Sequence, residues 1–276
     1  MLNSKIQKKL MESGREFTKG YRLNDPYMDS FESDQQLKLP QPPIVKAPVT
    51  PEESWIFLTK DFSSVVTKQD ILELMRDRRS IRIFTGESMS FDQLSFLLWA
   101  TQGIKSVRGS KSPSTRRTVP SAGARHQFET YMLVQNVDGL KPGAYHYLPL
   151  HHALEFLGTV DNIEQKVNDS LYGQTWGSKA NLVFYWSMIP YRAEWRYGIY
   201  AHRMMLIDLG HIGQAMYTAC TAAGLGCCAI GTFMQELSDE IFNLDGEEEY
   251  IVYTTPVGTI RDCDKEADQA FYQPAK

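Results

Sequence analysis

Three arginines and a serine lie close together in the stretch RRSIRIF, residues 78–84. Because alternate residues of an extended chain face the same side, Arg78, Ser80 and Arg82 would point together and Arg79 away from them. Guanidinium groups form bidentate hydrogen bonds with phosphate oxygens, and a hydroxyl adds a further donor. The pattern favours an anion site, and the alternative is a helix end that simply carries cations.

Two segments of small residues could bring bare backbone against a flat ligand. The first is Pro120-Ser121-Ala122-Gly123, and the second is GLGCCAIGTF, residues 224–233. Because glycine has no Cβ, either segment would allow a ligand to approach the main chain closely. Each segment could also be a plain turn. The spacing of the second fits neither the dinucleotide-binding Gly-x-Gly-x-x-Gly pattern nor a P-loop.

The charge balance narrows the classes of partner. The chain has 29 Lys and Arg against 33 Asp and Glu, a formal net charge of −4, whereas nucleic-acid binding usually needs a basic face. The four cysteines form no Cys-x-x-Cys pair and the six histidines are not spaced as ligands, so no metal site is predicted. The N-terminus is too charged for a signal peptide, and no apolar run approaches the ~18 residues of a membrane span. We expect a cytoplasmic protein with a small anionic ligand and neither a nucleic-acid nor a membrane partner.

The N-terminal part differs in composition from the rest of the chain. Residues 4–18 have apolar side chains at helical spacing, and residues 24–53 contain six prolines. Because proline fixes φ and lacks an N–H group, residues 24–53 are predicted to form an extended arm. The arm could be a linker or could wrap a partner subunit. We therefore divide the chain into residues 1–60, a helix and a proline-rich extended arm, and residues 61–276, the main domain.

A mixed set of helices and strands must position these motifs. Asp70 is expected to cap a helix that leads into RRSIRIF, and Ser90 with Gln93 forms a capping box for a helix that ends at Gly103. Serines and basic residues predict a mobile surface loop at 105–118. Strands are expected at 131–137, 143–148, 181–189 and 247–260, and helices at 161–173 and 200–223. Because strands and helices do not alternate regularly, an α+β fold is favoured over a doubly wound sheet.

The order of the motifs resembles a known family. RRSIRIF, PSAGARH, GLGCCAIGTF and a final TPVGTI are similar to the flavin-binding stretches of the nitroreductase superfamily. FLLWATQGI, LKPGAYHYLPLHHALEFLG and LIDLGHIGQAMYTA resemble its SagB-type dehydrogenase branch, which includes azoline-oxidising enzymes of peptide-modifying clusters. The resemblance covers about residues 70–260. It implies a nitroreductase-like fold, with a central, mostly antiparallel sheet flanked by helices and FMN at a homodimer interface.

The resemblance also implies roles for particular residues. Arg78 and Ser80 would hold the phosphate or ribityl end of FMN, and Arg82 would reach the pyrimidine edge of its ring. Residues 120–123 would touch the flavin of the other subunit, and the backbone N–H groups of 231–232 would act as catalytic groups at flavin N5. The implied cofactor-binding residues are Arg78, Arg79, Ser80, Arg82, Pro120, Ser121, Ala122, Gly123, Gly231, Thr232 and Arg261.

One stretch departs from the SagB-type pattern. Azoline-oxidising relatives carry a Lys-Tyr pair ahead of the long helix, and here Arg196 and Tyr197 stand in its place. An arginine with a pKa above ~12 is a poor general base, so azoline oxidation is in doubt. Tyr197 is retained as a candidate catalytic proton donor, with a structural tyrosine as the alternative. Tyr191 and Arg192 could line a pocket nearby, and His211 is predicted to be a core histidine.

Three functions follow in order of preference. The first is an FMN-dependent oxidoreductase that takes hydride from NADH or NADPH and passes it to an electron-poor small molecule, such as a nitro compound or quinone. The second is a SagB-type dehydrogenase that oxidises an azoline or another peptide-derived substrate. The third is a dimeric flavin-binding interaction protein without turnover.

Overall fold

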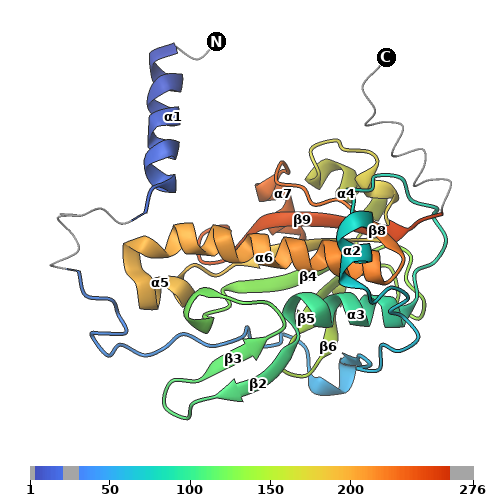
Figure 1. The fold of residues 1–276 in the computed structure, drawn as a ribbon, viewed down its shortest axis with the longest axis horizontal. Coiled ribbons are helices and arrows are strands. Elements are labelled where there is room, and N and C mark those ends of the chain that lie inside the picture. Colours follow the sequence, from blue (N-terminus) through green and yellow to red (C-terminus); the bar gives the residue numbers. More distant parts are fainter. Residues whose placement is uncertain (1–3, 21–30, 262–276) are drawn as a thin grey trace.

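The computed structural model of the chain describes residues 4–20 and 31–261 (Figure 1). The part of the predicted arm around Pro26 lies outside the described residues. Helix α1 (Ser4–Thr18) has the predicted bounds and stands apart from the rest of the molecule in Figure 1. Its apolar residues Ile6, Leu10 and Phe17 are exposed. Among the described residues, no helix is long and apolar enough to cross a membrane.

A seven-stranded sheet forms the centre of the molecule, in the order β1-β6-β5-β4-β7-β9-β8. Every neighbouring pair in this sheet is antiparallel, which confirms the predicted mostly antiparallel α+β architecture. The strands are β1 (Ile56–Phe57), β4 (Phe128–Val134), β5 (Gly143–Leu148), β6 (Ala153–Gly158), β7 (Leu182–Met188), β8 (Leu225–Cys227) and β9 (Tyr250–Thr259).

Helices cover both faces of the sheet. On one face lie α3 (Phe91–Gln102) and α6 (Ala201–Ala222), and on the other lie α4 (Ile163–Ser170) and α7 (Gln235–Ile241) (Figure 1). This explains the uninterrupted apolar sequence of β7, where Phe184 and Trp186 enter one core and Val183 and Tyr185 the other. The remaining helices are α2 (Ile71–Asp77), α5 (Tyr191–Tyr197) and the single turns Glu52–Ser54, Ala122–Ala124, Gly177–Lys179 and Gly198–Tyr200.

The segment predicted as a mobile surface loop is instead a β-hairpin. Strands β2 (Ile104–Arg108) and β3 (Ser114–Arg117) pair antiparallel outside the main sheet. Most of their side chains are exposed, so the sequence lacks the apolar alternation by which a half-buried strand is recognised. Backbone hydrogen bonds between the two strands define the hairpin, and they leave no trace in the pattern of residue types.

The described part of the proline-rich arm lies against its own chain. The N–H of Lys46 donates to Glu129 Oε1 at 2.7 Å, and those of Val49 and Thr50 donate to Glu155 Oε2 at 2.8 and 3.0 Å. Both carboxylates are buried in the sheet, on β4 and β6. These two carboxylates therefore accept hydrogen bonds from backbone N–H groups of the arm, which in a sheet would pair with a neighbouring strand. Whether it also contacts a partner subunit stays a prediction.

Candidate functional site

The stretch RRSIRIF runs extended beside the edge of the sheet. The N–H of Ile81 donates to Cys227 O at 2.8 Å, and the N–H of Thr85 donates to Thr259 O at 2.9 Å. Ile81 is buried and packs on Gly226, where a Cβ would come within 2.8 Å of the Ile81 side chain. Glycine at 226 thus brings GLGCCAIGTF and RRSIRIF, which are 145 residues apart in the chain, into contact.

Tyr217 of α6 connects these two stretches. Its hydroxyl shares a 3.0 Å hydrogen bond with Ser80 Oγ and accepts a 2.9 Å hydrogen bond from the N–H of Ala229. The guanidinium carbon of Arg78 lies 5.4 Å from the centre of its ring. Burial raises the pKa of Tyr217 to about 12, so the hydroxyl keeps its proton at neutral pH. Tyr217 was not predicted from the sequence, because nothing in the helical pattern distinguishes one half-buried tyrosine from others.

The side chain of Arg82 lies over the ring of Trp176, 5.6 Å from its centre. Burial raises the pKa of the Cys228 thiol, and the charge of Arg82 opposes this rise, so the guanidinium faces the glycine-containing segment. In that segment Gly231 and Thr232 are exposed, and a Cβ added at Gly231 would meet nothing within 4 Å. Exposed backbone therefore follows, three residues further along the segment, the Cys228 thiol on which the charge of Arg82 acts, and this combination fits a flat anionic cofactor such as FMN.

Arg79 and Arg261 are the other two arginines predicted to bind the cofactor. Arg79 lines a cavity of about 280 Å³ together with Lys68, Ile81, Cys220 and Tyr217, the tyrosine that also forms a hydrogen bond with Ser80. Arg261 is exposed and follows the end of β9 by two residues. Their assignment to a flavin phosphate stays a prediction.

The turn Pro120-Ser121-Ala122-Gly123 is held by Asp208 of α6. Ser121 Oγ donates to Asp208 Oδ2 at 2.8 Å, and the N–H of Ala122 donates to the same atom at 2.9 Å. After the turn, Ala124 and His126 have φ values of 54° and 46°, in the left-handed region that non-glycine residues rarely adopt. Backbone strain of this kind is concentrated at functional sites.

Arg196 and Tyr197 pack directly on this turn. Gly123 has φ 56°, and a Cβ there would lie 2.5 Å from the Tyr197 hydroxyl and 2.7 Å from Arg196 Cδ. Only glycine allows this approach. Burial lowers the pKa of neighbouring Arg125, and the positive charge of Arg196 lowers it further. The structure thus brings together the turn at 120–123 and the pair Arg196-Tyr197, which lie more than 70 residues apart in the sequence.

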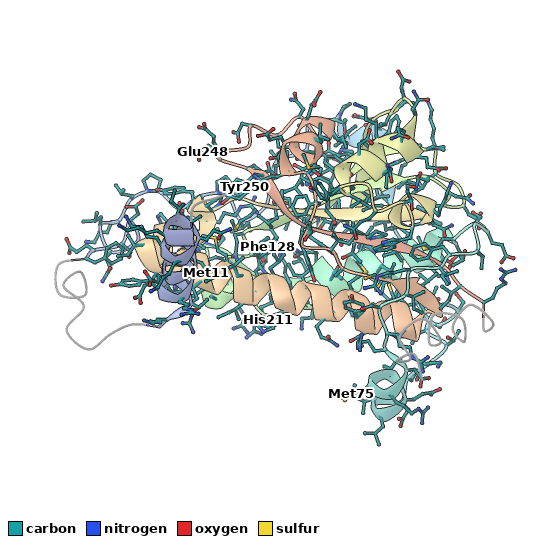
Figure 2. The ribbon with its side chains drawn as sticks, turned by 90° about the horizontal axis from the view of Figure 1, so that it is seen from above. Met11, Met75, Phe128, His211, Glu248 and Tyr250 are labelled. Carbon is teal, nitrogen blue, oxygen red and sulfur yellow. The ribbon has the colours of Figure 1, made fainter. Side chains whose placement is uncertain are left out.

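Within one chain the two groups of motif residues lie apart. They contact α6 at Asp208 and Tyr217, nine residues from each other, which corresponds to ~13.5 Å along a helix axis and to opposite sides of the helix. His211, between them, was predicted to be a core histidine, and this was wrong because it is exposed on α6 (Figure 2). Its apolar neighbours Leu206 and Ile207 are also exposed, by 51% and 50%.

The fold is similar to solved structures. A nitroreductase structure from Anabaena variabilis has a TM-score of 0.68 and 19% sequence identity, and the match covers 91% of this chain and 47% of that chain, about half of its length. An Escherichia coli microcin synthetase complex, McbBCD with truncated pro-MccB17 bound, has a TM-score of 0.57 and 21% identity, with 90% and 86% of the two chains covered. At these identities the likeness concerns the fold alone.

Sequence comparison assigns the family. A nitroreductase relative from Methanocaldococcus jannaschii is 30% identical over 190 residues, 67% of this chain and 89% of that protein. The trifolitoxin-processing protein TfxB of Rhizobium leguminosarum bv. trifolii is 27% identical over 134 residues, 47% of this chain and 36% of that protein. The pattern of the nitroreductase family matches residues 75–259, which include all three motif stretches. The chain therefore belongs to the nitroreductase family.

Proposed function

We propose that this protein is an FMN-dependent oxidoreductase that transfers hydride from NAD(P)H to an electron-poor acceptor such as a nitro compound or quinone. One observation carries the proposal: Tyr217 ties Ser80 to Ala229, which leads into the open backbone of Gly231. Donors for an anion and accessible main chain for a flat ring thus lie side by side. When bound, FMN would accept hydride at N5 and return it to a second substrate.

The residues of this chain would hold the cofactor and set its charge. Arg78 and Ser80 would bind the phosphate or ribityl end, with Arg79 and Arg261 adding positive charge there. Arg82 would face the pyrimidine edge, where a fixed cation stabilises developing negative charge. The N–H of Gly231, with Thr232 beside it, would donate a hydrogen bond to N5. These tasks require no protein nucleophile.

The proposal includes a cytoplasmic homodimer with FMN at the interface. Pro120, Ser121, Ala122 and Gly123 would contact the flavin of the partner subunit, which agrees with their separation from Tyr217 in one chain. Exposed apolar side chains offer a surface for such an interface, namely Leu206 and Ile207 on α6 and Ile71, Leu72 and Met75 on α2. Figure 2 shows α2, with Met75, projecting from the body of the molecule. In this scheme residues 61–276 form the FMN-binding domain, and residues 1–60 the N-terminal helix and arm.

A second candidate is a SagB-type dehydrogenase that acts on a peptide-derived substrate. The trifolitoxin-processing relative and the fold of the microcin synthetase favour it. In the first function Tyr197 would serve as the proton donor to the reduced acceptor, because its hydroxyl lies against Gly123 of the flavin-contacting turn. Arg196 argues against azoline oxidation, since a guanidinium does not remove protons at neutral pH. A flavin-binding protein without turnover is the third candidate.

A visible spectrum of the purified protein tests the proposal. We expect flavin bands near ~370 and ~450 nm that bleach when NADH or NADPH is added without oxygen. Recovery of the bands on addition of a quinone would support the first function. Bleaching of the oxidised bands by a thiazoline peptide, which gives hydride to the flavin, would select the second. Bands that neither nucleotide bleaches favour the second or third function. A colourless protein that takes up no added FMN would contradict all three.

A further inference from the structure

The hairpin β2–β3 and the turn that follows it are unusually basic for this chain. Residues 93–128 contain no aspartate or glutamate, although the chain as a whole has a net charge of −4. The cations in this range are Lys105, Arg108, Lys111, Arg116, Arg117 and Arg125. Positive charge is therefore concentrated next to the turn 120–123, which belongs to the proposed flavin site.

A cavity of about 500 Å³ lies between the hairpin and this turn. It is lined by Lys105 and Arg116 from the hairpin and by Pro120 and Ser121 from the turn, among others. The pairing of the two strands shifts register between Ile104 and Ser106, so Lys105 is the bulged residue. Bulges redirect side chains and are frequent next to active sites. The volume is in the range of cavities that hold small molecules.

Arg117 also lines this cavity and is only 4% exposed. Its guanidinium donates to the neutral oxygens Gln102 Oε1 at 2.8 Å and Ile44 O at 3.3 Å, and it has no ion pair within residues 4–20 and 31–261. Burial lowers its pKa to about 10, so it stays charged at neutral pH. Glu129 attracts this charge and opposes the lowering of its pKa, but among the described residues no carboxylate forms an ion pair with it, although buried charges are normally paired.

His126, which also lines the cavity, adds no charge of its own. Burial lowers its pKa to about 3, and the positive charges of Arg117, Arg125 and Arg192 contribute to the shift. It is therefore neutral at physiological pH. The contribution of these three positive charges means that a further cation beside His126 is disfavoured.

We propose that this cavity binds an oxyanion group, phosphate or carboxylate, of the small molecule that exchanges hydride at the flavin. The inference rests on the function proposed above, because only then does the turn 120–123 face a flavin. Two sources share this chemistry: the pyrophosphate of the nucleotide donor and a carboxylate on the acceptor. Lys105, Arg116 and Arg117 would contact the oxygens, and the cavity would thereby select anionic substrates over neutral ones.

Paired substrates test this proposal and identify the source. The double variant Lys105→Ala/Arg116→Ala is compared with Arg108→Ala/Lys111→Ala, which removes the same charge from the same hairpin outside the cavity lining. Donors are NADH and the uncharged 1-benzyl-1,4-dihydronicotinamide, and acceptors are 4-nitrobenzoate and nitrobenzene. We expect Lys105→Ala/Arg116→Ala to raise the KM of either NADH or 4-nitrobenzoate about tenfold or more. The KM of the uncharged substrate in the same pair should not change. Equal effects on the charged and neutral members, or equal effects of the two variants, would overturn the proposal.

Two further measurements separate this cavity from the cofactor site. The Lys105→Ala/Arg116→Ala variant should purify with the same flavin content as the wild type, and loss of flavin would mean that the cavity holds the cofactor's phosphate instead. Calorimetric titration with inorganic pyrophosphate and with benzoate should show binding of at least one to the wild-type protein, weakened about tenfold in this variant. Because calorimetry needs no turnover, it decides the matter even if the proposed oxidoreductase activity fails. Absence of binding by both anions would contradict the inference.

Discussion

Two groups of buried or partly buried cations in this protein differ in their partners. Beneath the proline-rich arm, Arg192 pairs with Glu129 at 2.6 Å and Lys46 pairs with Glu249. Near the motif stretches, Arg78 and Arg117 contact rings and neutral oxygens and form no ion pair with a carboxylate of the described residues. The first group is complete within the chain and holds the arm in place. In our proposals the second group binds ligands, and this contrast would then distinguish structural from functional charge.

The largest expected effect comes from breaking a pair in the first group. Arg192→Met leaves the carboxylate of Glu129, which is 1% exposed, without its closest cation. We expect the free energy of unfolding in urea to fall by ~3–5 kcal/mol, as for other buried ion pairs. Arg108→Met, an exposed arginine on the hairpin, should leave it nearly unchanged. A loss below ~1 kcal/mol for Arg192→Met would mean that the pairs under the arm do not stabilise the fold.

Substitutions in the second group should weaken ligand binding and leave the free energy of unfolding nearly unchanged. Arg78→Ala with Arg82→Ala removes two cations at the proposed phosphate and ring positions, so FMN should bind at least ~100-fold more weakly, since each charge-assisted hydrogen bond contributes ~1.5–3 kcal/mol. The unfolding free energy of the flavin-free protein should change little. The recovery of flavin fluorescence on dissociation measures the affinity.

Arg108→Ala with Lys111→Ala serves as the control for net charge in that experiment and should keep the flavin. If the Arg78/Arg82 variant purified fully loaded with FMN, the assignment of RRSIRIF to the cofactor would be wrong.

Tyr217→Phe should have smaller effects on the free energy of unfolding and on the affinity for FMN. The substitution leaves the N–H of Ala229 without its acceptor and Ser80 without its partner. We expect ~1–2 kcal/mol less unfolding free energy and several-fold weaker FMN binding. Tyr253→Phe, a half-buried tyrosine whose hydroxyl has no hydrogen bond among the described residues, is the matched control. Equal behaviour of the two variants would show that Tyr217 does not position the site.

Much of the scaffold was predictable because its signals are local. The capping box of Ser90 and Gln93 begins α3, as expected from residues three apart. The helical spacing of Met205, Leu209 and Met216 in α6 marks its buried face, and all three are buried. The seven-residue apolar run of β7 likewise indicated a strand in the interior. In these elements, neighbouring residues carry the whole of the information.

The charge network was not predictable, because its contacts join distant parts of the chain. Lys46 and Glu249 are 203 residues apart, and Lys46 and Glu129 are 83 apart. Three consecutive glutamates at 247–249 would be expected to face solvent, yet Glu249 is only 8% exposed. Lys46, Tyr131 and Ser187 all donate to its carboxylate. Which acids are buried depends on which strands become neighbours, and residue type alone does not show this.

The smallest expected effect concerns pH and the first group. Burial alone would lower the pKa of His146, but Glu129 and Glu155 on either side raise it above the ordinary value of 6.5. A raised pKa means that the folded state binds the proton more tightly than the unfolded state. The stabilisation from this proton is therefore complete below about pH 6.5 and is lost as the pH rises through the folded-state pKa.

Urea unfolding of the wild type between about pH 6 and 9 measures this loss, with a slope of at most ~1.4 kcal/mol per pH unit for one proton. His146→Gln should remove this part of the slope, whereas His211→Gln, an exposed histidine, should keep it. An identical slope in the wild type and His146→Gln would mean that His146 is neutral between its two carboxylates. Glu155, which is 1% exposed, would then have no cationic partner. The presence of an ion-pair partner would no longer distinguish the charges under the arm from those at the proposed flavin site.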